Sequence, residues 1–276
     1  MYNGLVMLSR SLAALLAALW LASLAPVHAA PRRIVSLAPN ITEILFAVGA
    51  GPRVVGDTVY GDYPPAARKL PHIGDVNAND EAVVALRPDL VVADESANRA
   101  AIPRLRALHL PLLLIPAASR LGDVERNILS IGRACGETAR ARAVVAAMKA
   151  KERRAAKIRA GHAPLRTLIV VALDPLYVAG ARSFMGAAVR EAGGAVSAPG
   201  LFTPYSIEAA VASNPQVILC DAADAAALRA SPAWRATDAV RLGNLITPPP
   251  NLLDRAGPRL ADGLLLVARA LAAAKR

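Results

Sequence analysis

Short runs of apolar, mainly β-branched residues alternate along the chain with segments in which apolar residues recur at helical spacing. The runs predict strands at residues 33–37, 54–56, 90–93, 112–115, 168–173 and 217–220. Helices are predicted at residues 40–48, 121–135, 183–191 and 260–273. Asn40 is expected to cap the first of these helices, with Glu43 as its capping-box partner. The alternation of strands and helices is typical of parallel α/β units.

Residues 137–160 break this pattern, because they contain neither proline nor glycine and carry basic side chains around most of a helical circumference. The apolar stripe is narrow and consists of Val144, Val145, Met148 and Ile158. A long helix of this kind usually bridges two domains, and roughly 24 residues at 1.5 Å each would span about 36 Å. The sequence therefore predicts an N-terminal α/β lobe at residues 30–136, a connecting helix at 137–160 and a C-terminal α/β lobe at 161–276. An ordinary surface helix is the alternative for residues 137–160.

Residues 1–29 predict a signal peptide for export to the periplasm. One arginine and no acid precede the apolar run LAALLAALWLASLA, and Val27 and Ala29 supply the small residues that a signal peptidase needs. An uncleaved membrane anchor is the alternative, although the apolar run is short. No cysteine directly follows the run, so the sequence gives no sign of a lipoprotein anchor. Export would permit a disulfide between Cys135 and Cys220, with buried free thiols as the alternative.

The chain has a net charge of +11, and loss of the leader with Arg10 would leave +10. In an exported protein this balance favours anionic ligands or a membrane surface. No nucleic-acid-binding motif is present, so nucleic acid is not expected as a partner. The histidines outside the leader, His72, His109 and His162, lack metal-ligand spacing, so no metal site made by the protein is expected.

Two segments repeat the same order of residues, one in each predicted lobe. In each, an acid (Glu81 or Glu208) is followed after six residues by a proline (Pro88 or Pro215) and then by an apolar strand. Proline commonly follows a helix, so chance similarity is an alternative. The repeated unit nevertheless indicates two lobes of similar design.

Residues 33–65, RIVSLAPNITEILFAVGAGPRVVGDTVYGDYPP, and residues 70–93, LPHIGDVNANDEAVVALRPDLVVA, closely resemble the substrate-binding proteins of bacterial ABC importers for vitamin B12, ferric siderophores and haem. The resemblance runs from about Arg32 to Arg259 and is strongest to the cobalamin-binding members. It implies two Rossmann-like α/β lobes joined by a single long backbone α-helix, with the ligand in the cleft between the lobes. It also implies a periplasmic monomer that captures cobalamin, a vitamin B12-type corrinoid, and delivers it to the permease and ATPase of an importer. Haem and a ferric siderophore are the alternative ligands.

The loop after the second predicted strand contains Tyr60 and Tyr63, two of only five tyrosines in the chain. Such a loop should reach the cleft, because ligands bind at the carboxyl ends of the strands in these sheets. By the resemblance, Tyr60 corresponds to a tyrosine that stacks on the corrin of cobalamin-binding relatives, and Tyr63 to an axial ligand of haem-binding relatives. Aromatic faces suit a flat, mostly apolar macrocycle. Packing within the loop is the alternative for both rings.

The resemblance assigns four further residues to the ligand cleft: Pro39, Tyr177, Phe202 and Arg255. Tyr205 either lines the cleft or caps the helix that follows it. Arg255 together with Arg182 would favour an anionic siderophore. Cobalamin-binding relatives can carry a tryptophan ahead of the first repeated acid, but this chain has GDVN at residues 74–77, and Trp234 is its only tryptophan outside the leader.

Glu81 and Glu208 match the two surface glutamates, one per lobe, with which relatives dock on arginines of the permease. Exposed ion pairs add little energy but fix register and orientation. Acids favoured by the helix dipole at a helix start are the alternative. The sequence contains no nucleophile elbow, P-loop or His-Glu pair, so an enzyme is not expected. An exported α/β enzyme and a signalling receptor without an importer are the alternatives from other classes.

Overall fold

A four-stranded parallel sheet forms the centre of the N-terminal lobe in the computed structural model, which describes residues 29–276. The strand order is β2-β1-β3-β4, with β1 (Ile34–Ser36), β2 (Val54–Gly56), β3 (Leu90–Asp94) and β4 (Leu112–Ile115). The helical elements of this lobe are α2 (Pro39–Ala47), η1 (Gly51–Arg53), η2 (Ala67–Lys69), α3 (Asp80–Ala85), α4 (Ile102–Ala107) and α5 (Leu121–Ala134). Alternate strand residues pack on opposite faces: Ile34 shares a core with α2 and α5, whereas Val35 shares one with α3 and α4. Burial on both faces is what a parallel sheet requires.

The C-terminal lobe contains a mixed sheet around the long strand β5 (Leu165–Leu173). On one edge of β5, β9 (Val217–Leu219) pairs parallel with it, and β10 (Leu245–Ile246) pairs parallel with β9. On the other edge, the start of β5 pairs parallel with β7 (Gly194–Val196), and its end pairs antiparallel with β6 (Leu176–Ala179), which in turn pairs antiparallel with β8 (Phe202–Pro204). Its helices are α7 (Phe184–Glu191), α8 (Ile207–Ala212), α9 (Ala222–Ala230), α10 (Pro232–Arg235) and α11 (Asp238–Arg241). The strand pattern predicted β5 and β9 but not the antiparallel part.

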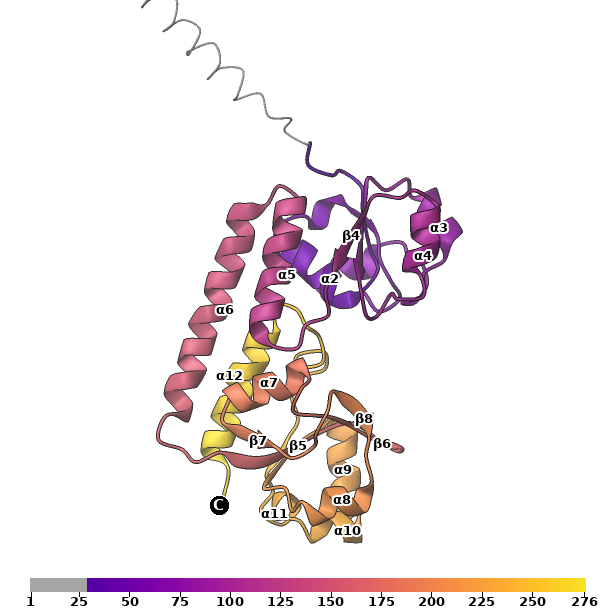
Figure 1. The fold of residues 1–276 in the computed structure, drawn as a ribbon. Coiled ribbons are helices and arrows are strands. Elements are labelled where there is room, and N and C mark those ends of the chain that lie inside the picture. The colour runs from indigo at the N-terminus through magenta and orange to yellow at the C-terminus, as the bar shows by residue number, and fades with distance from the viewer. Residues whose placement is uncertain (1–28) are drawn as a thin grey trace, which may run out of the picture. The chain divides into compact units, whose positions relative to one another are not determined.

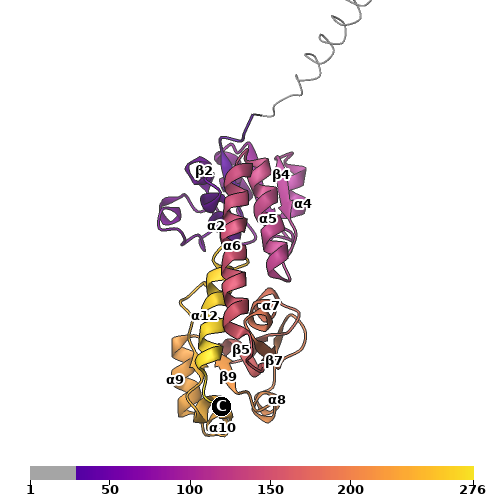
Figure 2. The same ribbon diagram turned by 90° about the vertical axis from the view of Figure 1, so that its left-hand side faces the viewer.

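The long helix α6 (Thr138–Arg159) lies within the predicted range and runs along both lobes (Figures 1 and 2). It packs against α5 on the N-terminal side and against α12 (Leu260–Ala273) and α7 on the C-terminal side. One continuous cluster of buried side chains extends from the N-terminal sheet, through Val145 and Met148 of α6, to α12. The predicted fold of two α/β lobes along a single long helix is therefore confirmed, whereas the exact lobe boundaries stay a prediction. Because a hinge motion would open this cluster, we expect the lobes to move little relative to each other.

The predicted signal peptide, residues 1–29, lies outside the described residues apart from Ala29. Within residues 29–276, no helix is long and apolar enough to cross a bilayer. Cys135 and Cys220 are buried free thiols rather than a disulfide. Burial raises the pKa of Cys135 to about 11 and that of Cys220 to about 12, so both thiols stay protonated at neutral pH.

The predicted capping box at the start of α2 is wrong. The helix begins at Pro39, with Ala38 at the N-cap position and no side-chain capping hydrogen bond. A proline in the first turn suits a helix start because the missing N–H would have no partner there. Asn40 instead donates to Asp94 Oδ2 at 3.3 Å, and Glu43 is buried among arginines of the C-terminal segment.

Three glutamates influence one another where α5, α6 and α7 pack together: Glu125, Glu152 and Glu191. Glu125 forms an ion pair with Lys149 at 3.3 Å. The Oε1 atoms of Glu125 and Glu152 are nevertheless buried, and neither has a hydrogen-bond partner in residues 29–276. Burial, followed by the charge of Glu125, raises the pKa of Glu152 to about 7. The same two causes raise the pKa of Glu191.

The Glu152→Gln variant is expected to be more stable than the wild type at high pH but not at low pH. The pKa of Glu152 is higher in the folded protein than its usual 4.5, so its protonation stabilises the fold fully below pH 4.5, and this contribution is lost as the pH rises through about 7. Allowing for solvent screening of this half-buried side chain, the variant should match the wild type at about pH 4 and exceed its free energy of unfolding by about 1–2 kcal/mol at pH 8. Urea unfolding of both proteins at the two pH values measures this. An equal difference at both pH values would contradict the assignment.

Candidate ligand-binding site

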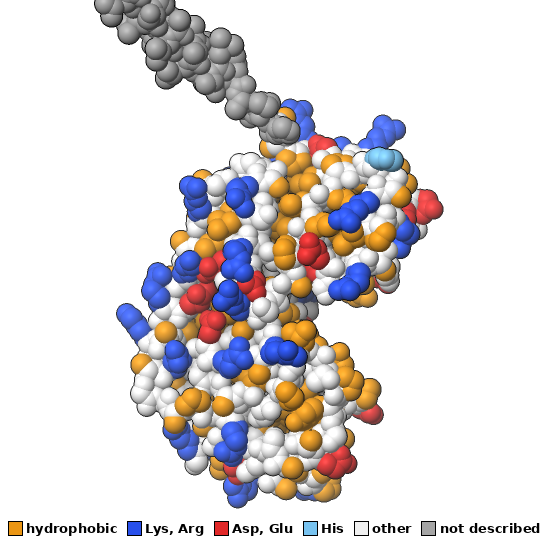
Figure 3. Space-filling view, viewed as in Figure 1, with side chains coloured by type: hydrophobic (Ala, Val, Ile, Leu, Met, Phe, Trp, Pro, Cys, Tyr) orange, Lys and Arg blue, Asp and Glu red, His pale blue; other side chains and the backbone are white. Residues whose placement is uncertain are grey.

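A cavity of about 520 Å³ lies between the two lobes, in the hollow that Figure 3 shows between the upper and lower halves of the molecule. All four N-terminal strands lead into it: the lining residues 38–40 and 117–119 follow β1 and β4, Tyr60 follows β2, and Asp94 ends β3 with Ser96 and Ala97 just beyond it. The C-terminal lobe contributes the start of α7, the start of β8 and residues 254–256. Ligands of open α/β sheets bind at this end of the strands.

Aromatic and aliphatic side chains face this cavity from both lobes. Tyr60 is 49% exposed on the N-terminal side, and Leu201 and Phe202 are partly exposed on the C-terminal side. Phe184 lines the same wall, with its ring centroid 5.7 Å from that of Phe202 at an interplanar angle of 56°. Large apolar side chains left exposed on two facing walls indicate a site for an apolar ligand. Sequence reasoning missed Phe184, although it is one of only three phenylalanines and directly follows Ser183, which caps α7.

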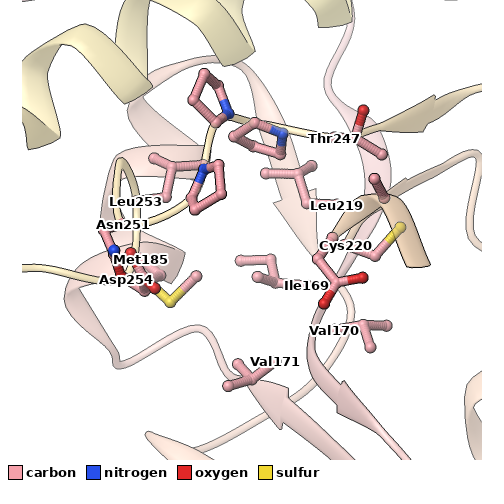
Figure 4. Close-up of a pocket in the computed structure, with 15 residues that line it drawn as sticks. Ile169, Val170, Val171, Met185, Leu219, Cys220, Thr247, Asn251, Leu253 and Asp254 are labelled. Carbon is pink, nitrogen blue, oxygen red and sulfur yellow. The ribbon is translucent and has the colours of Figure 1, made fainter. Parts of the chain in front are cut away.

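A second cavity of about 530 Å³ adjoins the first and shares Asp254 with it. Figure 4 shows Ile169 between two groups of side chains, with Met185, Asn251 and Asp254 on one side and Cys220 on the other. The lining comes entirely from the C-terminal lobe and includes residues 169–171 of β5, the end of β9 and most of the loop at residues 247–254. None of its 15 lining residues is Lys or Arg. Together the two cavities offer more room than a single small ligand needs.

Arg255 lines the first cavity but is already engaged by carboxylates. Its side chain is 10% exposed, and its Nη1 donates to Glu43 Oε1 at 3.2 Å and to Asp62 Oδ1 at 2.5 Å. Its Nη2 donates to the carbonyl oxygen of Tyr60 at 3.3 Å. Burial alone would raise the pKa of Asp62, but the hydrogen bond and charge of Arg255 outweigh it and hold that pKa below its usual value. The positive charge of Arg255 is thus balanced within the protein.

Arg259 extends the same network to the second tyrosine. It donates to Glu43 Oε2 at 3.0 Å through Nε and to Oε1 at 2.5 Å through Nη2, a two-pronged pairing with a carboxylate that is 1% exposed. Its guanidinium lies 3.8 Å from the ring centroid of Tyr63. The hydrogen bond to Glu43 raises the pKa of Arg259 further. Asn251 adds a hydrogen bond to Asp62 at 2.8 Å, so the loop with both tyrosines is tied to the segment ahead of α12.

Four of the six predicted ligand contacts line the first cavity: Pro39, Tyr60, Phe202 and Arg255. Tyr63 and Tyr177 line neither cavity. Tyr177 donates its hydroxyl hydrogen to the carbonyl oxygen of Phe202 at 3.2 Å, so it supports the strand that carries Phe202. The part of each residue in ligand binding stays a prediction.

The remaining candidates lie elsewhere. Ser206, not Tyr205, caps α8, and Tyr205 packs against the core of the C-terminal lobe. Trp234 is buried in that core. Arg182 is exposed and lines neither cavity, so it does not join Arg255 in a basic ligand site. Across residues 29–276, no group of three or more His, Cys, Asp or Glu side chains is arranged to hold a metal ion.

Glu81 and Glu208 occupy equivalent positions in the two lobes. Each is exposed and is the second residue of a short helix, α3 or α8. Asn79 caps α3 by accepting from Ala82 N at 2.8 Å, and Ser206 caps α8 by accepting from Ala209 N at 3.0 Å. Neither glutamate forms an ion pair within the described part of the chain.

Residues 34–252 match the sequence profile of the periplasmic binding protein family. The chain belongs to this family. A relative in Bacillus subtilis, the uncharacterized ABC transporter substrate-binding lipoprotein YvrC, is 33% identical over 244 residues, which cover 85% of this chain and 78% of that protein. The cobalamin-binding protein of Halobacterium salinarum is 28% identical over 255 residues, covering 87% of this chain and 69% of that protein.

Solved structures show the same architecture. The periplasmic heme-binding protein RhuT from Roseiflexus superposes with a TM-score of 0.80 at 29% identity, covering 88% of this chain and 98% of that one. The protein is therefore a periplasmic binding protein of the type that serves vitamin B12, haem and siderophores, and the family resemblance noted in the sequence is confirmed. The family provides the substrate-binding component of ABC importers.

Proposed function

We propose that the protein is a monomeric periplasmic receptor, without catalytic activity, that captures a cobalamin-type corrinoid between its lobes and delivers it to an ABC importer. The observation that carries the proposal is the combination of aromatic walls from both lobes with an arginine that Glu43 and Asp62 already neutralise. A corrin is flat and mostly apolar, so aromatic faces on both sides bury it effectively. Its fringe consists largely of neutral amides, which need hydrogen-bond partners rather than a free positive charge.

The polar groups of the first cavity support this choice of ligand. They include the carboxylates of Asp94 and Asp254 and the side chains of Asn40, Ser96 and Ser119. Carboxylates accept hydrogen bonds from amide N–H groups, whereas they repel the carboxylates of a haem or of an anionic siderophore. The second cavity adds Asp221 and no basic residue. The cleft thus favours a ligand with an uncharged, hydrogen-bond-donating edge.

Haem is the second candidate, because the heme-binding RhuT is among the similar structures. By the sequence resemblance, Tyr63 would correspond to an axial ligand of haem-binding relatives. In this protein the ring of Tyr63 lies under the guanidinium of Arg259 and lines neither cavity. That placement supports a role in holding the loop. Similarity to the cobalamin-binding protein of Halobacterium salinarum supports the corrinoid.

Glu81 and Glu208 are proposed to dock on the permease, since each projects from an equivalent helix start in its lobe. An uptake assay tests receptor function and docking together. Deletion of the gene is expected to abolish high-affinity uptake of labelled cyanocobalamin, and the wild-type gene should restore it. The doubly charge-reversed variant, Glu81→Lys with Glu208→Lys, should restore less than about a tenth of that uptake while binding cyanocobalamin as tightly as the wild type, because charge pairs at docking sites set orientation. Undiminished cyanocobalamin uptake after the deletion would refute the receptor function, and full uptake by the double variant would refute the docking role.

A further inference from the structure

In the loop that carries Tyr60, polar side chains are buried and apolar side chains are exposed, which is the reverse of the usual arrangement. Asp57 and Thr58 are completely buried, whereas the next two residues, Val59 and Tyr60, are 54% and 49% exposed. Burying a carboxylate while exposing apolar side chains opposes stability. The arrangement therefore indicates that this loop is shaped for a purpose other than folding.

Asp57 is tied to the far end of the loop through His72. Its Oδ1 accepts a hydrogen bond from His72 Nδ1 at 3.1 Å, while its buried Oδ2 has no partner in the described chain. The backbones of the two residues also form an isolated parallel bridge, in which Asp57 N donates to Pro71 O at 3.1 Å and Ile73 N donates to Asp57 O at 2.8 Å. The pair thus closes the base of the loop that contains both tyrosines.

The ionisation of the buried Asp57 carboxylate depends on its hydrogen bond with His72. Burial raises the pKa of Asp57 to about 6, and the hydrogen bond and charge of His72 limit the rise. At neutral pH the group is therefore mostly ionised, although it is buried. A buried carboxylate that loses its hydrogen-bond donor must take up a proton or move toward water.

A shift of the Asp57 carboxylate would displace the backbone of Gly61, the residue next to Tyr60. A Cβ atom at Gly61 would lie only 1.7 Å from Asp57 Oδ2, so the carboxylate packs directly against the backbone of residue 61. Gly61 N donates to Thr58 O at 2.9 Å, and Val59 N donates to Gly74 O at 3.0 Å. The residues on both sides of Tyr60 are thus held at the base of the loop, Gly61 by Thr58 next to Asp57 and Val59 by Gly74 just beyond His72.

We propose that Asp57 and His72 form a positioning pair that holds Tyr60 in the cleft, ready to stack on a flat ligand. The stacking part rests on the proposed function, whereas the effect on the loop does not. His72 acts as a hydrogen-bond donor to a buried acceptor, and its exposed imidazole takes no part in contacting the ligand. Neither residue lines either cavity.

Three variants test the pair: His72→Ala, His72→Asn and, as a matched control on another surface histidine, His162→Ala. His72→Ala is expected to fold, because Asp57 can take up a proton. It should bind cyanocobalamin about tenfold more weakly, and the backbone amides of residues 57–63 should exchange hydrogen about tenfold faster without ligand, since the buried acceptor has lost its donor. His72→Asn places an amide donor near the position of Nδ1 and should return both values to within about twofold of the wild type. His162→Ala should change neither.

The possible outcomes distinguish a failure of the proposed positioning role of Asp57 and His72 from a failure of the proposed corrinoid ligand. Unchanged exchange in residues 57–63 of His72→Ala would overturn the positioning role, and so would equal impairment of His72→Asn and His72→Ala. Faster exchange spread over the whole N-terminal sheet would also overturn it, because it would indicate general destabilisation. If the wild type does not bind cyanocobalamin, the proposed function fails, while hydrogen exchange of the unliganded variants still decides whether the pair holds the loop.

Discussion

Replacing Glu43 by alanine is expected to lower the free energy of unfolding by about 3 kcal/mol, because the change leaves two largely buried arginines without their shared carboxylate. Arg259 would lose both of its hydrogen bonds to a carboxylate, and Arg255 would keep Asp62 as its carboxylate partner. These side chains join α2 to the segment ahead of α12. The loss should therefore affect global unfolding, measured by urea denaturation at pH 7.

A matched control is Glu95→Ala, which removes an exposed glutamate of the same lobe that has no ion pair among the described residues. This variant should remain within about 0.5 kcal/mol of the wild type. A loss of less than about 1 kcal/mol in Glu43→Ala would mean that solvent or rearranged side chains compensate both arginines. The network would then not be a main link between the lobes.

The Tyr60→Ala variant is expected to weaken corrinoid binding by about 1–3 kcal/mol, the usual effect of removing an aromatic side chain stacked on a ligand. Tyr60 is half exposed in the unliganded protein and faces the cavity opposite Phe202. Its removal should therefore leave the free energy of unfolding nearly unchanged. Calorimetric titration with cyanocobalamin measures the affinity, and urea unfolding of the same variant checks the stability.

Tyr63→Phe is the matched control for Tyr60→Ala. It keeps the ring beneath Arg259 and removes only a hydroxyl that lines neither cavity, so cyanocobalamin affinity should stay within about twofold of the wild type. Equal affinities of wild type and Tyr60→Ala would remove Tyr60 from the site. A large loss in Tyr63→Phe would bring the second tyrosine into it.

The strands β1 to β5 and β9 and the helix α6 could be predicted because their signals are local, whereas the short parallel strands β7 and β10 were missed. The run LVVA at residues 90–93 is apolar over its whole length, as a strand buried on both faces must be, and α6 lacks both helix-breaking residues. The strands β6 and β8 were missed because each is short, which leaves too few residues for a periodic signal. β6 follows β5 in a hairpin across Asp174 and Pro175, whereas β8 pairs with β6 from a separate segment, so its register depends on contacts that no local pattern contains.

In the site, too, residues with a local sequence signal could be predicted, whereas contacts between segments far apart in the chain could not. Tyr60 could be predicted from a scarce aromatic residue in a loop after a strand, and the cavity lies at that end of the sheet. Glu43 was misassigned because its spacing from Asn40 fits a capping box, whereas its partner Arg255 is 212 residues away. The pairing of Asp57 with His72 could not be predicted either. Whether a loop carboxylate is buried depends on the folded chain around it and not on its neighbours in sequence.

The central claim, that the cleft receives a corrinoid, is tested most directly by titrating the protein without residues 1–29 with cyanocobalamin and, in parallel, with hemin. Calorimetry and absorbance should show tight one-to-one binding of cyanocobalamin and no comparable binding of hemin, because the cleft presents aromatic walls and no unneutralised arginine. Hemin binding with a tyrosinate-type spectrum, together with no heat from cyanocobalamin, would contradict the account and make Tyr63 the central residue of the site.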